Sequence, residues 1–495
     1  MRFDVVVRGG RLVVPYQGIV EADIGIVGGT ISAVAQGLEG GEVIDATGMT
    51  VFPGCVDTHT HYGHFNEFYS EMHAESANMA ALGITTSIVL LDRSVKSMDG
   101  WLHRRDDPEL FALPETGEKG IAHAMFRGSY HLVVPEAIER SAGHSFMDYG
   151  FHLGMTNLAQ VGEIVEYVAE YGITSFKAWP GLYQWAALAG EDLRSFLVAC
   201  RDSGALPYVN TVNSALQQQI AAEVYASAGV DPSASPPALL RRANGHPLVE
   251  TYDMQTTLWL ARSVGSPRIC IVHVTSADGV EVIRSYKESH GLDVEGEVGS
   301  AWLDLSWPDA ERLGHQATCI IPQLGDTVAV DALWDGIRAG ILTVAGTDGV
   351  VSPTPRFPDG SPNPMYAPPP TRERRGLGFP CHIVHFPITL DNAMSRGLGE
   401  VAVAELCAAN PARLLDLYPR KGTIAAGSDA DLVVVDVRSP HTIRSSELAT
   451  TAPFNPWEGR EVRGWPALTM LRGSVIARDG RPVGVPTGEY LRRSV

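Results

Sequence analysis

A pair of histidines in the run Asp57-Thr58-His59-Thr60-His61 is the first feature of this sequence that could do chemistry. Residues two apart in an extended strand point to the same side, so His59 and His61 can bind one cation together. A His-x-His pair is common by chance. Here it follows an apolar segment and the turn signal Pro53-Gly54, and this context favours a metal site.

Three further ionisable residues end apolar runs: Lys177 in TSFKAW, His273 in IVHVT and Asp348 in AGTDG. A buried ammonium group is costly, so Lys177 must be neutral, paired or modified, unless its chain reaches past the apolar residues to solvent. A neutral lysine can add carbon dioxide to give a carbamate, whose two oxygens could bridge two cations. A lone His or Asp at a strand end is usually structural, but the recurrence of such residues favours a metal centre.

Eight short apolar runs in the middle of the chain are the elements that must position these residues. They are residues 51–57, 84–91, 147–154, 173–179, 206–211, 268–274, 293–298 and 341–347. Helix-length segments separate most of them, which is typical of a parallel sheet covered on both faces. The pattern predicts an α/β protein with a (β/α)₈ TIM-like barrel, whose sites lie at the carboxyl ends of the strands.

One of the intervening segments, residues 162–172, predicts an amphipathic helix. Its buried face is expected to contain Ile164, Val165, Val168 and Ala169.

Both ends of the chain have a different texture, with short strands separated by glycines that favour antiparallel hairpins. We therefore predict a small composite β-sandwich from residues 1–52 and 421–495, around a barrel at 53–420. Three connections are too long for plain crossovers. Lid loops are expected there, at about residues 92–146, 212–250 and 352–374.

The composition limits the class of protein. The 495 residues include 38 Lys+Arg and 57 Asp+Glu, a net charge of −19, which disfavours nucleic acid and anionic membranes as partners. No apolar run reaches the roughly 20 residues of a membrane helix, and Asp4 and Arg8 stand where a signal peptide would be apolar. The six cysteines form no CxxC pair, as expected for thiols in a reducing cytosol. The sequence predicts a cytoplasmic enzyme with a small-molecule substrate.

With these residues in place, the sequence resembles the cyclic amidohydrolases of the dihydropyrimidinase, hydantoinase and allantoinase family. The resemblance covers nearly the whole chain. Its motifs are Asp57-x-His59-x-His61, LGITT (82–86), DYGFH (148–152), Lys177, IVHVTS (271–276), GTD (346–348) and residues 410–436. It implies a barrel with a β-sandwich, a zinc pair bridged by a carboxylated lysine, and a homo-oligomer, commonly a tetramer.

The resemblance also implies a ligand set. His59, His61, Lys177 and Asp348 would hold one zinc ion, and Lys177, carboxylated by carbon dioxide, would share a second with His273; manganese is an alternative metal. Such ions lower the pKa of bound water to about 7 and so supply hydroxide. Asp348 would be the catalytic residue, acting as general base toward the water and then as general acid toward the leaving nitrogen.

Two positions depart from the family. Asn210, in VNTVN, stands where the family has a metal-binding histidine, and an amide oxygen is a poorer zinc ligand than imidazole. Asn210 is therefore a doubtful ligand: the second metal could be weak, replaced by a harder ion or absent, or His246 could take its place. The other departure is Gly349, where the family often has a histidine directly after the aspartate.

Two residues are candidates for binding substrate. Tyr183, six residues after Lys177, matches an aromatic hydroxyl that binds substrate in relatives, although ordinary packing is the alternative. Ser300, after the seventh strand, is the other candidate, and a turn serine is its alternative reading. The arginines of RERRGLGF could meet a substrate carboxylate or form a solvated charge run; they are Arg372, Arg374 and Arg375.

Three functions remain open from the sequence. The leading hypothesis is a metal-dependent hydrolase of a cyclic amide, imide or ureide C–N bond, with an unusual ring favoured over dihydrouracil, simple hydantoins or allantoin. A second is a single-metal hydrolase of an acyclic amide, carbamate or urea-like bond. A third is a non-catalytic dihydropyrimidinase-like scaffold, which the retained ligands disfavour because a scaffold has no need for them.

Overall fold

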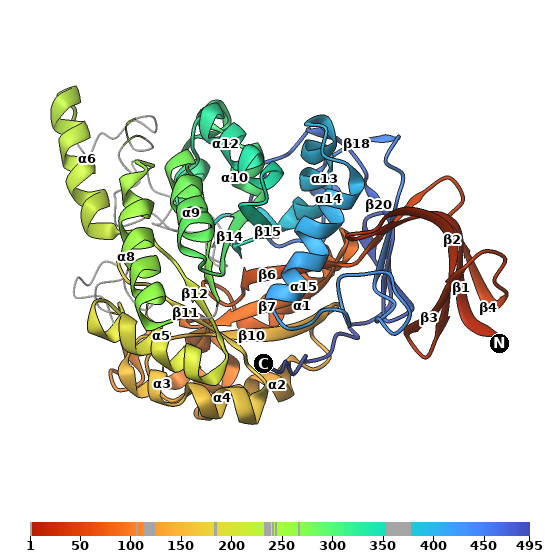
Figure 1. Cartoon of the computed structure of the whole chain (residues 1–495), viewed down its shortest axis with the longest axis horizontal. Helices are drawn as coiled ribbons and strands as arrows, with labels where there is room; N and C mark the ends of the chain where they lie inside the picture. Colours follow the sequence, from red (N-terminus) through yellow and green to blue (C-terminus); the bar gives the residue numbers. More distant parts are fainter. Residues whose placement is uncertain are drawn as a thin grey trace.

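Two sheets of nine strands each organise the molecule (Figure 1). One is a curled parallel sheet surrounded by helices, and the other is a mixed sheet made from both ends of the chain. The computed structural model describes residues 2–104, 107–112, 124–182, 186–231, 245–265, 268–352 and 378–495, together with Leu239 and Arg242.

The parallel sheet is the TIM-like barrel that the sequence predicts, and the α/β fold class is confirmed. Its strand order is β15-β14-β13-β12-β11-β10-β7-β6-β16, and β16 pairs with β6, which brings the last barrel segment beside the first. The strands are β6 (Cys55–His61), β7 (Ile84–Leu91), β10 (Asp148–Gly154), β11 (Ser175–Ala178), β12 (Leu206–Val209), β13 (Ile269–Ile271), β14 (Val294–Gly299), β15 (Leu342–Gly346) and β16 (Gly349–Val350).

The first predicted strand, residues 51–57, divides between the two sheets. Residues Thr50–Pro53 form β5 of the mixed sheet, and β6 starts at Cys55 in the barrel. The change falls at Gly54, where an added Cβ would lie 2.2 Å from the Thr85 hydroxyl oxygen, so only glycine fits. Because β6 continues to His61, both histidines lie inside the strand rather than after it.

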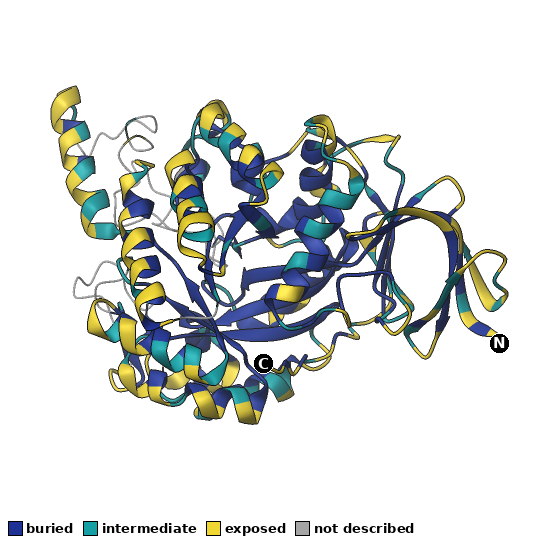
Figure 2. Cartoon of the chain, viewed as in Figure 1, coloured by how far each residue is buried: buried dark blue, intermediate teal, exposed yellow. Residues whose placement is uncertain are grey.

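Helices cover the outside of the barrel, and Figure 2 shows the strands buried beneath helices whose outer faces are exposed. The helices are α1 (Phe68–Ala81), α2 (Val134–Ser141), α3 (Leu158–Gly162), α4 (Ile164–Tyr171), α5 (Glu191–Ser203), α6 (Ser214–Ala228), α8 (Leu248–Val264), α9 (Ala277–His290), α10 (Ser300–Asp304), α11 (Trp307–Leu313), α12 (Thr327–Arg338), α13 (His385–Ser395), α14 (Glu400–Ala404) and α15 (Asn410–Leu414). Of the helices that the structure describes, none is both long and apolar enough to cross a membrane.

The buried face of α4 differs from the predicted face, because the helix is rotated about its axis relative to the prediction. Ile164 is buried, but Val165 is 57% exposed, and Tyr167 and Tyr171 take the inward positions instead. The hydroxyl of Tyr167 accepts a hydrogen bond of 2.9 Å from the backbone N–H of Tyr130. A tyrosine can be buried when its hydroxyl has such a partner, so a pattern that counts only aliphatic residues misplaces this face.

The mixed sheet joins the two ends of the chain, as predicted. Its strands are β1 (Phe3–Val14), β2 (Gly18–Val27), β3 (Thr30–Ala35), β4 (Gly40–Asp45), β5 (Thr50–Pro53), β17 (Leu432–Val435), β20 (Pro466–Leu471), β21 (Ser474–Arg478) and β22 (Arg481–Pro482). The hairpins β1–β2 and β2–β3 are antiparallel, but β4 and β5 pair with β1 in parallel, so the expectation of antiparallel hairpins throughout is wrong. Pairing in parallel requires the chain to cross back after β3, which a local turn pattern does not reveal.

The long connections contain regular structure where they are described. Residues 92–146 include the 3₁₀ helices η1 (Arg93–Ser97), η2 (Asp99–Arg104) and η4 (Tyr130–Leu132), the short strands β8 (Phe111–Ala112) and β9 (Met125–Phe126), and α2. The segment 212–250 contains α6, and 352–374 lies outside the described residues apart from Ser352. Their role as lids stays a prediction.

Candidate metal centre

Four of the predicted ligands meet at the carboxyl end of the barrel. His59 and His61 come from β6, Lys177 from β11, and Asp348 from the link between β15 and β16. The Oδ1 atom of Asp348 lies 2.9 Å from His61 Nε2 and 3.4 Å from His59 Nε2, and Lys177 Nζ contacts His59 Nε2. Strands far apart in the sequence thus bring these side chains to one point.

The donor set fits a divalent cation. Two atoms bound to one tetrahedral zinc at about 2.0–2.1 Å lie about 3.4 Å apart, close to the separations among His59, His61 and Asp348. Burial lowers the pKa of both histidines, which keeps the imidazoles in the neutral form that binds metal. Burial also lowers the pKa of Lys177 and so favours its neutral amine, while the charges of Asp348 and Glu297 partly oppose this.

Two predicted ligands have an unusual backbone conformation. His273 has φ 40° and Asp348 has φ 46°, in the left-handed region that residues with a side chain rarely adopt. The N–H of Asp348 donates to the His59 carbonyl at 2.9 Å, which fixes the turn against β6. Such strain is typical of functional sites, where the surrounding structure holds a side chain in place.

Asp57, the first residue of the histidine motif, does not join the ligand group. Its carboxylate accepts hydrogen bonds from the N–H and hydroxyl of Thr347, at 2.8 and 3.0 Å, and from the Ser87 hydroxyl at 3.1 Å. Burial raises the pKa of Asp57 to about 6, although these donors oppose the rise. Asp57 therefore ties the strand that carries the histidines to the turn that carries Asp348.

Glu297 on β14 is a functional residue that sequence reasoning missed. Its Oε1 lies 3.4 Å from His59 Nδ1, and its Oε2 accepts hydrogen bonds from the hydroxyls of Thr58, at 2.5 Å, and Tyr208. Burial raises its pKa to about 8. Carboxylates commonly orient metal-binding histidines in this way. The signal was a glutamate in the middle of a buried strand, within VEGEV.

A hydrogen bond joins Asn210 to His273, the two residues at the position where the resemblance implies a second metal. The Asn210 Nδ2 atom lies 2.8 Å from His273 Nε2, and the Asn210 Oδ1 accepts from the N–H of Val212 at 3.1 Å. Both ends of the Asn210 amide are therefore engaged by protein groups. His246 is exposed, and its Nδ1 accepts from the N–H of Leu248 at 3.2 Å, so it does not replace the missing ligand here.

The remaining sequence candidates lie elsewhere. Ser300 is buried, and its hydroxyl donates to the carbonyl of Cys381 at 3.1 Å rather than to the pocket. Tyr183 lies outside the described residues, as do Arg372, Arg374 and Arg375. At Gly349 an added Cβ would lie 2.2 Å from the His382 Nδ1, so no side chain fits where the family often has histidine.

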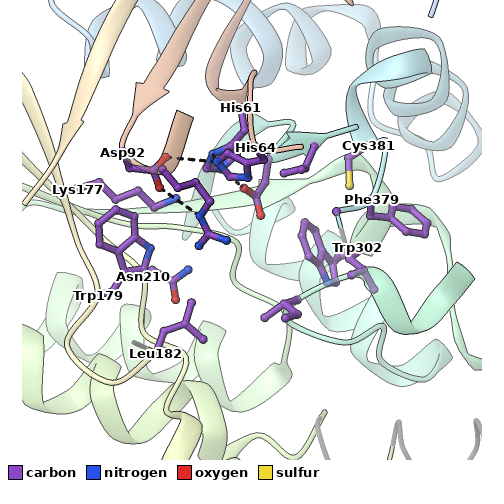
Figure 3. A pocket seen from close by; sticks show the side chains of 16 residues that line it. His61, His64, Asp92, Lys177, Trp179, Leu182, Asn210, Trp302, Phe379 and Cys381 are labelled. Atoms are coloured by element: carbon purple, nitrogen blue, oxygen red, sulfur yellow. Dashed lines mark hydrogen bonds and ion pairs between the residues drawn. The ribbon is translucent and has the colours of Figure 1, made fainter. Parts of the chain in front are cut away.

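A pocket opens over the ligand group, and the space within and in front of it, open solvent included, is about 630 Å³ (Figure 3). Aromatic and aliphatic side chains form part of its wall, and ionisable side chains form the rest. The lining residues are His61, His64, Asp92, Arg93, Lys177, Trp179, Leu182, Asn210, Trp302, Ile320, Ile321, Asp348, Val350, Gly378, Phe379 and Cys381. The pocket has the mixed apolar and polar wall that is typical of a site for a small ligand.

His64 and Asp92 in this wall were not singled out from the sequence. The Nε2 of His64 lies 3.0 Å from His61 Nδ1 and 3.3 Å from Asp92 Oδ1. Burial raises the pKa of Asp92, but His64 and Arg93 oppose it and hold the value well below its usual range. The signals were His64, three residues after His61, and an Asp-Arg pair directly after the strand at 84–91.

Comparison with known proteins extends along the whole chain. A model of the amidohydrolase family matches residues 249–476. An allantoinase from Rubrobacter xylanophilus is 30% identical over 99% of this chain and 98% of its own length. An L-hydantoinase from Paenarthrobacter aurescens is 26% identical over 97% of this chain and 95% of its own.

Solved structures of such enzymes also match this chain over nearly its whole length. A dihydropyrimidinase from Brevibacillus agri superposes with a TM-score of 0.80 and 25% identity, covering 99% of this chain and 98% of that one. A D-hydantoinase superposes with a TM-score of 0.82 and 25% identity, covering 99% of both chains. The barrel and the mixed sheet are therefore common to all of these proteins.

Proposed function

The chain belongs to the cyclic amidohydrolase family of hydantoinases, dihydropyrimidinases and allantoinases, and from this premise we propose that it is a metal-dependent hydrolase that opens a C–N bond of a cyclic amide, imide or ureide. One observation carries the proposal. His59, His61, Lys177 and Asp348 converge with the separations of ligands around one cation, at the floor of a pocket at the carboxyl end of the barrel.

His59, His61, Asp348 and a carboxylated Lys177 would hold a zinc ion, with manganese as the alternative. Carboxylation joins the neutral Lys177 nitrogen to the carbon of carbon dioxide and releases the proton of that nitrogen. When bound, the ion supplies a Lewis acid that activates water and polarises the carbonyl of the substrate. The burial of Lys177, which favours a neutral amine, supports this step.

Asp348 would move the proton. Burial raises the pKa of its carboxyl, but the hydrogen bond from His61 lowers it below its usual value. The carboxylate is thus ionised at neutral pH and can take a proton from the attacking water at one oxygen. It then gives that proton to the leaving nitrogen, which acts as a better leaving group once protonated.

The bond between Asn210 and His273 favours one ion over two. It also gives specific support to a second candidate, a single-metal hydrolase of an acyclic amide, carbamate or urea-like bond. The similarity over the full length to ring-opening enzymes keeps the cyclic substrate first. The ligand group disfavours the scaffold, because a scaffold would not need four converging side chains.

Two further points remain part of the proposal. A homo-oligomer, and a tetramer in particular, rests on the family resemblance alone. A cytoplasmic location is supported by five described cysteines that are free and buried, since an oxidising compartment favours paired thiols.

The test compares the wild-type protein with Asp348→Asn and a surface control, Asp335→Asn, whose aspartate is 74% exposed. Metal per chain is measured by elemental analysis after expression with zinc or manganese, and turnover is measured on a panel of hydantoins, cyclic imides and ureides. We expect about one ion in the wild type and a loss of turnover of about 10²–10⁴-fold in Asp348→Asn alone. A folded Asp348→Asn protein with normal turnover, or a wild type without metal, would overturn the proposal.

A further inference from the structure

We propose that Arg93 binds a carboxylate on the substrate, so that the substrate class is a cyclic amide with an acidic substituent. This inference rests on the proposed function and adds the chemical class of the ring. It starts from the one cationic side chain among the described pocket residues that has no place in the ligand group.

Arg93 comes from the part of the barrel that carries the chemistry. It opens the 3₁₀ helix η1 directly after β7, at the same end of the barrel as the metal ligands. Its side chain is only 7% exposed, yet it lines the pocket together with Lys177 and Asp348. A substituent of a ring held over Asp348 would therefore lie in the same pocket as this largely buried guanidinium group.

Asp92 lies beside this arginine as an ion-pair partner. The Asp92 Oδ2 atom lies 3.8 Å from Arg93 Nε, while Asp92 Oδ1 is engaged by His64 Nε2 at 3.3 Å and by the N–H of Ser94 at 3.4 Å. A guanidinium carries five N–H donors in a planar fork, which matches the two oxygens of a carboxylate. Binding of a substrate carboxylate would use some of the N–H donors of Arg93, while the others stay bonded to protein groups.

Charge explains why a local cation is needed. The chain has a net charge of −19, which repels an anionic substrate over most of the surface. In the pocket, Asp92 and Asp348 add negative charge beside the ring. Arg93 supplies the compensating charge at close range, where it is least screened by water.

The rest of the wall suits the body of such a substrate. Trp179 and Trp302 present flat apolar surfaces to the pocket, and Leu182 lies near Trp179 (Figure 3). A planar amide ring packs well against aromatic faces. The pocket therefore combines a surface for a flat ring with one guanidinium for an anionic group.

Two hydantoins test the inference, because the hydantoins of aspartate and asparagine differ only in a carboxylate against a carboxamide. We would measure kcat/KM for both with the metal-loaded wild type, Arg93→Gln, Arg93→Lys and the control Arg104→Gln. Arg104 lies on η2, is 43% exposed and pairs with Asp107. The wild type and Arg104→Gln should prefer the carboxylate by about tenfold or more, Arg93→Gln should lose this preference, and Arg93→Lys should keep part of it.

The ratio of the two substrates separates recognition from a structural role. A damaged fold lowers turnover of both hydantoins equally and leaves their ratio unchanged, and thermal unfolding with metal content reports on the fold directly. The same preference in Arg93→Gln as in the wild type would overturn the inference. If the wild type hydrolyses neither ring, the proposed function fails for hydantoins, and calorimetric binding of the same pair still decides: a carboxylate preference that depends on Arg93 supports the inference, and equal or no binding overturns it.

Discussion

At the scale of single residues, Asn210 is the position at which the proposal of one metal ion can be tested. The Asn210 side-chain amide contacts His273 through Nδ2 and the N–H of Val212 through Oδ1. A second ion at this position would have to replace the hydrogen bond between Asn210 and His273. Imidazole is a better zinc ligand than an amide oxygen. A single substitution can therefore restore the ligand that the family has at this position.

We predict that Asn210→His raises the metal content from about one to about two ions per chain, since the introduced imidazole and His273 would then share an ion with Lys177. Elemental analysis of protein expressed with added zinc measures the change. Asn210→Ala is the matched control, because it removes the hydrogen bond to His273 without adding a ligand, and it should stay at one ion. Two ions in the wild type or in Asn210→Ala would contradict the prediction.

The residues of the site differ in how far the sequence reveals them. His59, His61, Lys177 and Asp348 could be predicted because each is a polar residue at the end of an apolar strand. Glu297 could not, because its role depends on contacts across the barrel interior with side chains of β6 and β12. The contact between His64 and Asp92 could not be predicted either, because it depends on the pairing of β6 with β7.

At the scale of elements, α13 contains a buried histidine that makes stability depend on pH. His385 begins this helix, is 2% exposed, and its Nδ1 has no hydrogen-bond partner among the described residues. Burial lowers its pKa from 6.5 to about 4. Between these values the unfolded chain binds a proton that the folded protein excludes, so acid favours unfolding.

We predict that this histidine removes about 2 kcal/mol of the free energy of unfolding when the pH falls from about 7 to about 5. Other buried histidines also contribute to the loss in acid. The total loss should therefore be about 2 kcal/mol smaller in His385→Gln than in the wild type, and unchanged in His290→Gln, whose histidine is exposed at the end of α9. Urea unfolding at the two pH values measures the free energy for each variant. An equal loss in all three proteins would show that His385 does not cause it.

The elements also show what a sequence pattern can and cannot determine. Each of the eight apolar runs overlaps one strand of the parallel sheet from β6 to β15, although the first run also contributes to β5, and the short ninth strand β16 was not predicted. The rotation of α4 was wrong, since Tyr167 and Tyr171 are buried and Val165 is not. The parallel pairing of β4 and β5 with β1 was also missed, because pairing between distant segments leaves no local signal.

At the scale of the whole molecule, a buried charge cluster joins the barrel to the mixed sheet. The Lys421 Nζ atom lies 2.5 Å from Asp148 Oδ2 on β10, and 2.9 and 2.8 Å from carboxylate oxygens of Asp429 and Asp431, which precede β17. Lys421 is fully buried. Burial lowers its pKa, but the three carboxylates raise it above its usual value, so the amine stays charged.

We predict that Lys421→Met lowers the free energy of unfolding by about 3–5 kcal/mol, because it removes the ion pair of the buried Asp431 carboxylate and leaves Asp148 and Asp429 with only their arginine partners, Arg472 and Arg420. Arg420→Met is the control: that arginine is 47% exposed and pairs with Asp429, so its loss should cost at most about 1 kcal/mol. Thermal and urea unfolding measure both. Equal stability of the two variants would mean that the cluster does not hold the sheets together.

The passage of the chain from β5 to β6 limits how this protein can vary in length. Side chains alternate along an extended strand, so inserting or deleting one residue between Gly54 and His59 would turn both imidazoles toward the helical layer. Asp348 would keep its position and lose its contacts with both histidines. Homologues that keep the activity should therefore show no single-residue insertion or deletion in this stretch, whereas the turns between β1, β2 and β3 can change length freely.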